Sequence, residues 1–167
     1  MRPKKKMLAA GTLFTLFLLA ADQLTKYFAC RFLAGTSGIT LIPGVFELYY
    51  LENRGAAFGI LNNRQLFFVL IALCISAFAI YVYARLPYES SYHPLRFVCS
   101  LIIAGALGNM IDRLARGYVI DFLYFSLIDF PVFNIADCYV CIGAGLAVIL
   151  LFTIYRSEEF LFLRPHQ

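Results

Sequence analysis

Four long apolar runs divide the chain. Uncharged residues extend over 7–21, 65–84, 97–111 and 138–155. A helix needs about 20 residues to cross the hydrocarbon core of a bilayer. The second and fourth runs have about that length, and the other two reach it by including polar residues at one end. The pattern predicts transmembrane helices over about 7–28, 65–84, 96–114 and 137–155, in one integral membrane domain of residues 1–167.

Between the first two helices, the hydrophobic pattern is that of short strands. Ile39 to Leu51 is rich in β-branched and aromatic residues and is interrupted by Pro43-Gly44, which predicts two strands around a turn. The small residues of Asn53–Gly59 follow and permit close approach of a backbone or a ligand. The predicted fold is therefore an all-α polytopic membrane protein with a small β-rich lobe, about residues 31–63, on the outer membrane surface.

Composition and charge agree with a membrane protein. Charged residues make up 14% of the chain, against about 25% in soluble domains. With the N-terminus inside, eight Lys and Arg residues are cytoplasmic and six are outside, so the positive-inside rule favours cytoplasmic termini. The net charge of +4 comes mainly from the basic start of the chain, and we predict no nucleic-acid partner. Lys26 and Tyr27 stand where a cleavable signal peptide needs small residues, so we interpret the first run as an uncleaved helix.

Three aspartates, Asp121, Asp129 and Asp137, lie between the last two apolar runs. Two of them adjoin membrane-length sequence, where an ionised carboxylate costs about 2.5–3.5 kcal/mol, which indicates function. Taken alone, Asp121 could be a solvated loop residue, and Asp137 could simply begin a helix capped by Asn134. Two carboxylates held close together share one proton, and such a pair activates water against an amide bond without a metal or a cofactor.

Other polar residues border the same side of the predicted membrane. Asp22 and Lys26 are spaced i,i+4 at the end of the first helix, either as a membrane anchor or as support for a site. The third helix carries four polar residues on one face: Asn109, Asp112, Arg113 and Arg116. We expect Asn109 and Arg113 to contribute to a site, and Arg116 to pair with Asp112.

Two other function classes remain open on the residues alone. Cys138 and Cys141 form a C-x-x-C pair that a thiol oxidoreductase would need, although no second pair is at hand. A small carrier could use Asp22 and Asp112 as ion sites, but the chain shows no repeat or broken helix. His93, in a predicted inner loop, and the tail residue His166 lie away from the acids, so we predict neither a histidine nucleophile pair nor a metal site.

Five segments in order resemble the signature blocks of lipoprotein signal peptidases (signal peptidase II). They are D-Q-L-T-K at 22–26, N-R-G-A-A-F-G at 53–59, G-N-M-I-D-R at 108–113, V-I-D-F at 119–122 and F-N-I-A-D at 133–137. The resemblance implies an aspartic endopeptidase of the bacterial cytoplasmic membrane, which cleaves prolipoproteins before a cysteine that carries diacylglycerol. Its implied partners are lipid-modified prolipoprotein signal peptides and membrane lipid. We expect a monomer with its active site near the outer face.

The resemblance also implies roles for individual residues. Asp121 and Asp137 match the catalytic pair, and we interpret Asp137 as the base and Asp121 as the acid. The aromatic residues around Asp121 predict a flap that lies against lipid. The remaining matched positions line or support the site: Asn53, Gly55, Asn109, Arg113, Asn134, Asp22, Lys26 and Asp112.

Overall fold

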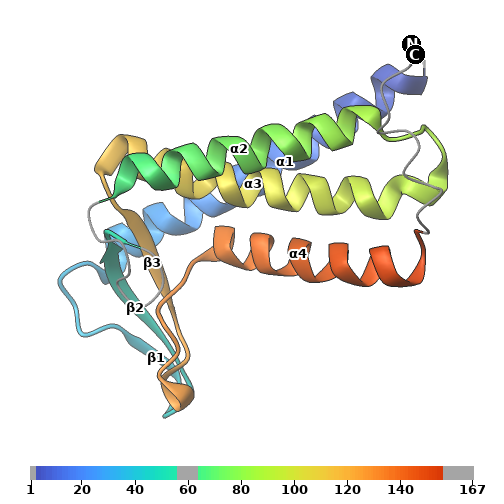
Figure 1. Ribbon diagram of the computed structural model, residues 1–167. Helices are drawn as coiled ribbons and strands as arrows, with labels where there is room; N and C mark the ends of the chain where they lie inside the picture. The colour runs from blue at the N-terminus through green and yellow to red at the C-terminus, as the bar shows by residue number, and fades with distance from the viewer. Residues whose placement is uncertain (1–2, 56–63, 156–167) are drawn as a thin grey trace.

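Four long helices lie side by side in the computed structural model, which describes residues 3–55 and 64–155 (Figure 1). They are α1 (Pro3–Leu33), α2 (Gln65–Arg85), α3 (His93–Arg116) and α4 (Ile135–Thr153). Each is long and apolar enough to cross a membrane. A three-stranded sheet adjoins one end of the helices, and α1 begins and α4 ends at the other (Figure 1). The predicted fold class, four apolar helices with a small β lobe, is confirmed.

Helix α3 is the most buried of the four and packs against each of the others. Small residues allow this close packing. A Cβ added at Gly105 would lie 2.5 Å from the carbonyl oxygen of Ala136, and one added at Gly108 would lie 2.5 Å from Oδ2 of Asp22. Glycines at these two positions therefore bring α1 and the start of α4 against α3.

The ends of α3 follow from its sequence. A short 3-10 helix (Ser90–Tyr92) precedes it, Pro94 occupies its first turn, and Gly117 ends it with a φ of 78°. The helix begins at His93, three residues before the predicted start of the span. The prediction that His93 belongs to a loop was therefore wrong, because proline in the first turn favours an earlier helix start.

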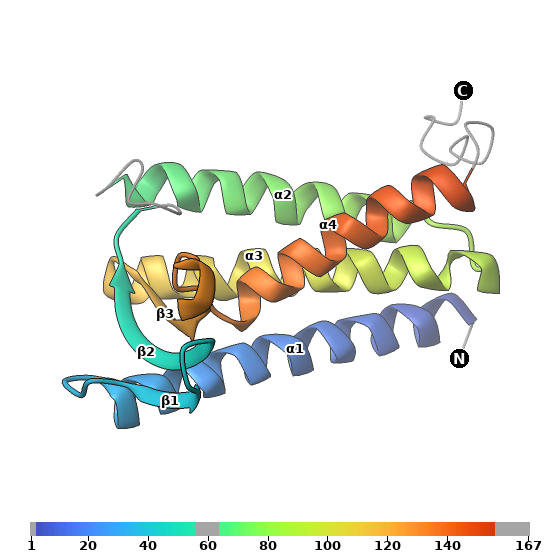
Figure 2. The ribbon, with the colours of Figure 1, turned by 90° about the horizontal axis from the view of Figure 1, so that it is seen from below.

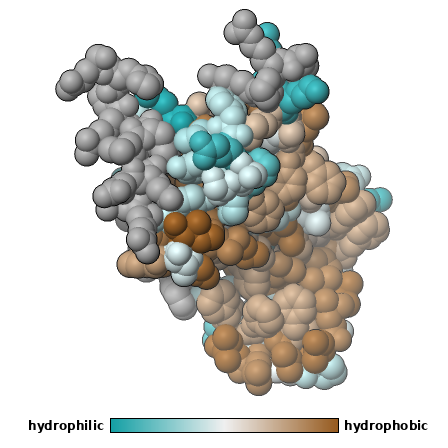
Figure 3. Space-filling model, turned by 90° about the vertical axis from the view of Figure 1, so that its right-hand side faces the viewer, coloured by the Kyte–Doolittle hydropathy of each residue, from teal (hydrophilic) through white to brown (hydrophobic). Residues whose placement is uncertain are grey.

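The outer faces of the helices are apolar. Phe17, Phe78 and Phe152 are 68%, 67% and 87% exposed. Such side chains are stable when lipid surrounds them. Figure 3 views the molecule from the end where α1 begins: hydrophobic residues cover most of its coloured surface, and hydrophilic ones gather beside the grey segments.

The sheet contains β1 (Ile39–Ile42), β2 (Phe46–Asn53) and β3 (Val119–Tyr124), in that order and all antiparallel. The two strands predicted around Pro43-Gly44 are present. The third strand comes from the segment between α3 and α4, so the lobe is not built from residues 31–63 alone. In addition, α1 extends to Leu33, beyond its predicted end at residue 28. Figure 2 shows β2 curving across the helix ends.

The last turns of α1 support the sheet. Ala29 and Leu33 form a buried cluster with Ile120 and Phe122 of β3. The segment around Asp121 is therefore a paired strand packed on a helix, and the prediction of a flap there was wrong. Ile120 and Phe122 are buried against α1 and do not face lipid, whereas Leu123 and Tyr124 are partly exposed. A second 3-10 helix, Ser126–Ile128, follows β3.

Candidate active site

Asp121 lies in the middle of β3 with only 1% of its surface exposed. It pairs with Leu51 of β2, which places Asn53 diagonally across on the neighbouring strand. The Asn53 side chain donates to Oδ2 of Asp121 at 2.8 Å. The Asn134 side chain donates to Oδ1 at 2.6 Å. Amide donors from two separate segments therefore hold both oxygens of this carboxyl group.

Asp137 lies in the first turn of α4. It forms a capping box with Asn134, whose side chain accepts from the Asp137 N–H at 3.0 Å and whose N–H donates to Oδ2 of Asp137 at 3.1 Å. The Asn109 side chain of α3 donates to Oδ1 at 2.7 Å. The helix dipole and these donors all stabilise a negative charge at Asp137.

Asn134 connects the two aspartates. It is fully buried, and its side-chain amide donates to Asp121 and, at 3.1 Å, to Oδ1 of Asn109. Its position is fixed because β3 bonds to the segment before α4, with backbone hydrogen bonds in both directions between Leu123 and Phe133. One asparagine thus contacts the Asp121 carboxyl group through its side-chain amide and the Asp137 carboxyl group through its backbone N–H.

Burial of Asp121, followed by the negative charge of Asp137, raises the pKa of Asp121 from 3.8 to about 7. The hydrogen bonds from Asn53 and Asn134 and the charge of Lys26 oppose this rise. The Asp121 carboxyl group therefore retains its proton up to near-neutral pH. A buried acid coupled to a second acid has the electrostatic character of a catalytic dyad.

A buried ionic network centred on Lys26 adjoins the two aspartates. Its Nζ is 2.9 Å from Asp22 and 3.2 Å from Asp112, and it donates to Oδ1 of Asn109 at 2.8 Å. Asp112 also pairs with Arg116 at 2.6 Å, as predicted. Lys26 is 0% exposed, so the alternative of a lysine that extends to the membrane surface was wrong.

This network also holds the backbone beside each aspartate of the pair. Oδ2 of Asp112 accepts from the N–H of Ile120 at 3.2 Å, one residue before Asp121. Oδ1 of Asp22 accepts from the N–H of Ala136 at 3.0 Å, one residue before Asp137. Lys26 therefore joins the two acids that position the flanking backbone.

Arg113 borders the site from α3. Its guanidinium donates to the carbonyl oxygens of Asn109 at 3.4 Å and Gly55 at 3.5 Å, and lies 4.7 Å from the centre of the Phe68 ring. Its positive charge acts on Asp137, Asp121 and Asp112. Gly55 is buried, and its N–H donates to the side chain of Asn53 at 3.0 Å.

The structure brings every predicted site residue into this one region. Residues 56–59 of the N-R-G-A-A-F-G segment and the tail residue His166 lie outside the described residues. The sequence reasoning missed Gln23, whose side chain donates to Asp22 and to the Gly108 carbonyl oxygen. It also missed Phe68, because nothing in an apolar helix marks one aromatic ring as the support of an arginine.

The cysteines form no disulfide beside this arrangement, although Cys138 directly follows Asp137. All five cysteines are free, with Cys138 half-buried and Cys141 exposed. Within residues 3–55 and 64–155, no cluster of three or more His, Cys, Asp or Glu side chains has metal-binding geometry.

Comparison with known proteins gives one consistent result. The family model described as signal peptidase (SPase) II matches residues 14–153. The chain is 39% identical over 145 residues to a lipoprotein signal peptidase of Streptococcus pyogenes serotype M1, covering 87% of this chain and 92% of that protein. A lipoprotein signal peptidase of Streptococcus pyogenes serotype M5 (strain Manfredo) is 41% identical, again over 87% of this chain and 92% of that protein.

Solved structures agree with the sequence relatives. One bacterial membrane enzyme superposes with a TM-score of 0.78 at 32% identity, covering 89% of this chain and 93% of its own. A second superposes with a TM-score of 0.74 at 33% identity, covering 88% and 95%. Family model, sequence relatives and fold all extend over most of the chain, and the protein therefore belongs to the signal peptidase II family.

Proposed function

We propose that this protein removes signal peptides from diacylglyceryl-modified prolipoproteins, and that Asp121 and Asp137 carry out the hydrolysis before the lipidated cysteine. The observation that carries the proposal is that both carboxyl groups, one from β3 and one from α4, bond to the same buried Asn134. Family membership supports the reaction, and this geometry supports the choice of the two residues.

The charges around the pair support a shared proton. Four carboxyl groups, of Asp22, Asp112, Asp121 and Asp137, face three cations, of Lys26, Arg113 and Arg116. With every group ionised, one negative charge is left uncompensated in a region of low dielectric constant. A single proton on the aspartate pair makes the cluster neutral, and the raised pKa of Asp121 makes that residue its natural holder.

A mechanism for amide hydrolysis follows from this distribution. Asp137, stabilised as an anion by the N-terminus of α4 and by the Asn109 amide, accepts a proton from water as the water attacks the scissile carbonyl carbon. Asp121 then donates its proton to the nitrogen of the leaving amine, and the C–N bond breaks. The aspartate pair again holds one proton, which is now on Asp137, because Asp121 has given its own proton to the amine. Because coupled acids titrate as a pair, the assignment of base and acid describes which aspartate holds the proton before the reaction begins.

The segment that follows β3 offers a surface for the lipid part of the substrate and for the bilayer. Beyond β3, Phe125, Leu127, Ile128 and Phe130 are 41–69% exposed, although all four are large and apolar. Acyl chains would cover these side chains at lower free energy than water does. We propose that this rim contacts membrane lipid at the end of β3 that points away from the helices (Figure 1).

We also propose the orientation in the membrane. The basic residues Lys5, Lys6, Arg85 and Arg96 lie at the end where α1 and α3 begin and α2 ends (Figure 1). By the count of the whole sequence, eight Lys and Arg residues belong to that side and six to the other, so the positive-inside rule favours a cytoplasmic location for that end. The aspartate pair, at the sheet end, then lies near the outer face of a bacterial cytoplasmic membrane. Since one chain supplies every described group of the site, a monomer is sufficient for activity.

The test is cleavage of a purified diacylated precursor by Asp121→Asn and Asp137→Asn. Each variant should lose activity by about 10⁴-fold or more, the loss typical of removing one member of a catalytic unit. Asp129→Asn is the matched control, since Asp129 is exposed, has a φ of 48° that asparagine tolerates, and bonds to Tyr124. Substantial cleavage by either dyad variant would refute the assignment, provided that the variant inserts in membranes as the wild type does.

Two further arms separate this mechanism from its rivals. Cleavage should persist in the presence of a general metal chelator, because the dyad activates water directly. It should also persist in the Cys138→Ser/Cys141→Ser variant, which removes the C-x-x-C pair. Loss of activity in the second arm would favour thiol chemistry.

A further inference from the structure

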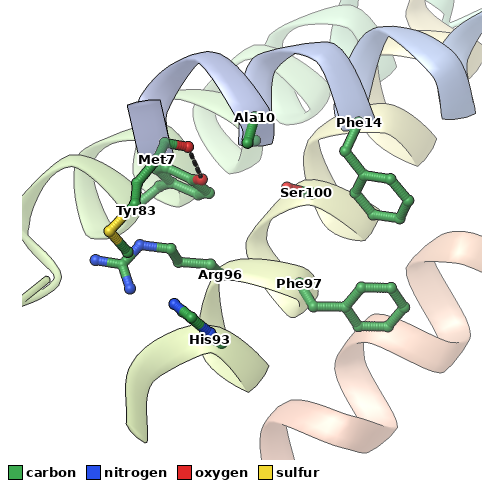
Figure 4. A pocket seen from close by; sticks show the side chains of 9 residues that line it. Met7, Ala10, Phe14, Tyr83, His93, Arg96, Phe97 and Ser100 are labelled. Carbon is green, nitrogen blue, oxygen red and sulfur yellow. Dashed lines mark hydrogen bonds between the residues drawn. The ribbon is translucent and has the colours of Figure 1, made fainter. Parts of the chain in front are cut away.

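A second polar position lies at the opposite end of the helices. A cavity of about 240 Å³ opens between the start of α1, the end of α2 and the start of α3 (Figure 4). Its polar lining includes Arg96, His93 and Tyr83, and its apolar lining includes Ala10, Phe14 and Phe97. None of these residues takes part in the aspartate site.

Arg96 is a buried cation with an unused donor. Only 6% of its surface is exposed, and one guanidinium nitrogen, Nη2, donates to the carbonyl oxygens of Leu86 at 3.0 Å and Pro87 at 2.6 Å. The other, Nη1, is buried without a hydrogen-bond partner in the described part of the chain. Nor does any carboxylate of residues 3–55 and 64–155 form an ion pair with Arg96. A buried charge in this state is costly, which indicates that an anion completes the site.

The aromatic surroundings of the guanidinium reduce this cost only in part. Its central carbon lies 5.9 Å from the centre of the Tyr83 ring and 5.7 Å from that of Tyr88. Cation–π contacts stabilise the charge but leave the Nη1 hydrogens unbonded. Among the described residues, Nη1 therefore keeps unbonded N–H donors on a charged group, and charged donors of this kind bond the oxygens of a phosphate.

The opposite side of the cavity is apolar. Figure 4 shows the rings of Phe14 and Phe97 together, away from Arg96 and His93, and their centres are 5.6 Å apart in a stacked arrangement. Ala10 also lines the cavity, and Figure 4 shows it on α1 between Met7 and Phe14. A cation at one end and aromatic rings at the other suit an amphiphile whose anionic group lies beside hydrocarbon.

We propose that this cavity, the Arg96 pocket, binds the phosphate group of an anionic phospholipid, with its glycerol and adjoining acyl carbons against Phe14 and Phe97. Exposed Lys5 and Lys6 precede Met7 of the pocket on α1 and attract anionic headgroups to this end of the molecule. The ligand would tie the start of α1 to the end of α2 and the start of α3, the three segments that line the cavity. This site is independent of the proposed peptidase chemistry.

The test is binding of phosphatidylglycerol to the purified full chain, measured by native mass spectrometry against phosphatidylcholine. The wild type should prefer phosphatidylglycerol. Ala10→Phe should weaken this preference by about tenfold, because it fills the cavity without changing any charge or any bond of Arg96. Arg96→Gln should weaken it at least as much. Arg85→Gln is the matched control, since Arg85 lies at the same end of the molecule and outside the pocket. It should weaken the preference for phosphatidylglycerol by only about fivefold, through the loss of one surface charge that attracts anionic headgroups.

Several results would overturn the proposal. An unchanged preference in Ala10→Phe, or an equal loss in Arg85→Gln and Arg96→Gln, would mean that lipid responds to surface charge alone. Competition by inorganic phosphate as strong as that of the lipid would mean a small-anion site. A preference that appears only in a Glu158→Gln/Glu159→Gln variant would mean that the chain's own carboxylates fill the pocket. Because Arg96→Gln also removes two bonds to the α2–α3 connection, Ala10→Phe is the decisive variant if Arg96→Gln fails to fold.

Discussion

Replacing Asn134 with serine tests the link between the two aspartates. Serine retains an oxygen that caps α4, but it cannot supply the amide hydrogen that Asp121 accepts at 2.6 Å. That hydrogen bond favours the ionised form of Asp121 and therefore lowers the pKa of Asp121. Its loss should raise this pKa further above 7.

The size of the effect follows from the strength of the bond. A hydrogen bond to a charged group is worth about 1.5–3 kcal/mol, and one pKa unit corresponds to about 1.36 kcal/mol. In the wild type, cleavage should decline as the pH rises through about 7, where Asp121 loses its proton. In Asn134→Ser, the midpoint of this decline should move upward by about 1–2 pH units. The maximal rate should also fall, since the carboxyl group is less firmly oriented.

The assay is the pH profile of kcat/KM for a diacylated precursor, which reports the free enzyme. Asn53→Ala provides a second route to the same change, because Asn53 donates to the other oxygen of Asp121 and is not the residue that caps α4. Its decline should move in the same direction. Asn134→Ala should behave like Asn134→Ser in pH profile and be less stable by about 1 kcal/mol, the value of the lost cap. An alkaline decline that stays near pH 7 in Asn134→Ser and in Asn53→Ala would refute the assignment of that proton to Asp121.

Two further predictions concern stability in detergent. Since the pKa of Asp121 is raised from 3.8 to about 7, the folded state binds a proton that the unfolded state has released between these pH values. The thermal midpoint should therefore fall as the pH rises from about 4 to about 7 and then level off. Asp121→Asn should remove this pH dependence, and an identical slope in both proteins would count against the raised pKa of Asp121. Lys26→Met should lower the free energy of unfolding by about 3–5 kcal/mol, because it leaves Asp22 and Asp112 buried without their shared cation; calorimetry that finds wild-type stability would contradict this network.

Much of the architecture was determined by the sequence itself. The lengths of the uncharged runs predicted four helices, because crossing a bilayer requires a fixed length of apolar helix. Pro43-Gly44 within an aromatic and β-branched segment predicted the hairpin, because the turn and strand preferences are local. The residues of the site were identified in the same way, by short motifs whose spacing is visible along the chain.

The tertiary structure alone decided how those residues meet. The i,i+4 spacing of Asp22 and Lys26 fitted a surface anchor as well as a site, and only the packing of α1 on α3 buries Lys26 within reach of Asp112 and Asn109. The pairing of β3 with β2, which converts the segment around Asp121 from a predicted flap into a strand, depends on contacts between residues far apart in sequence. Such contacts depend on which faces of the helices pack against each other. The local hydrophobic periodicity does not determine which faces these are.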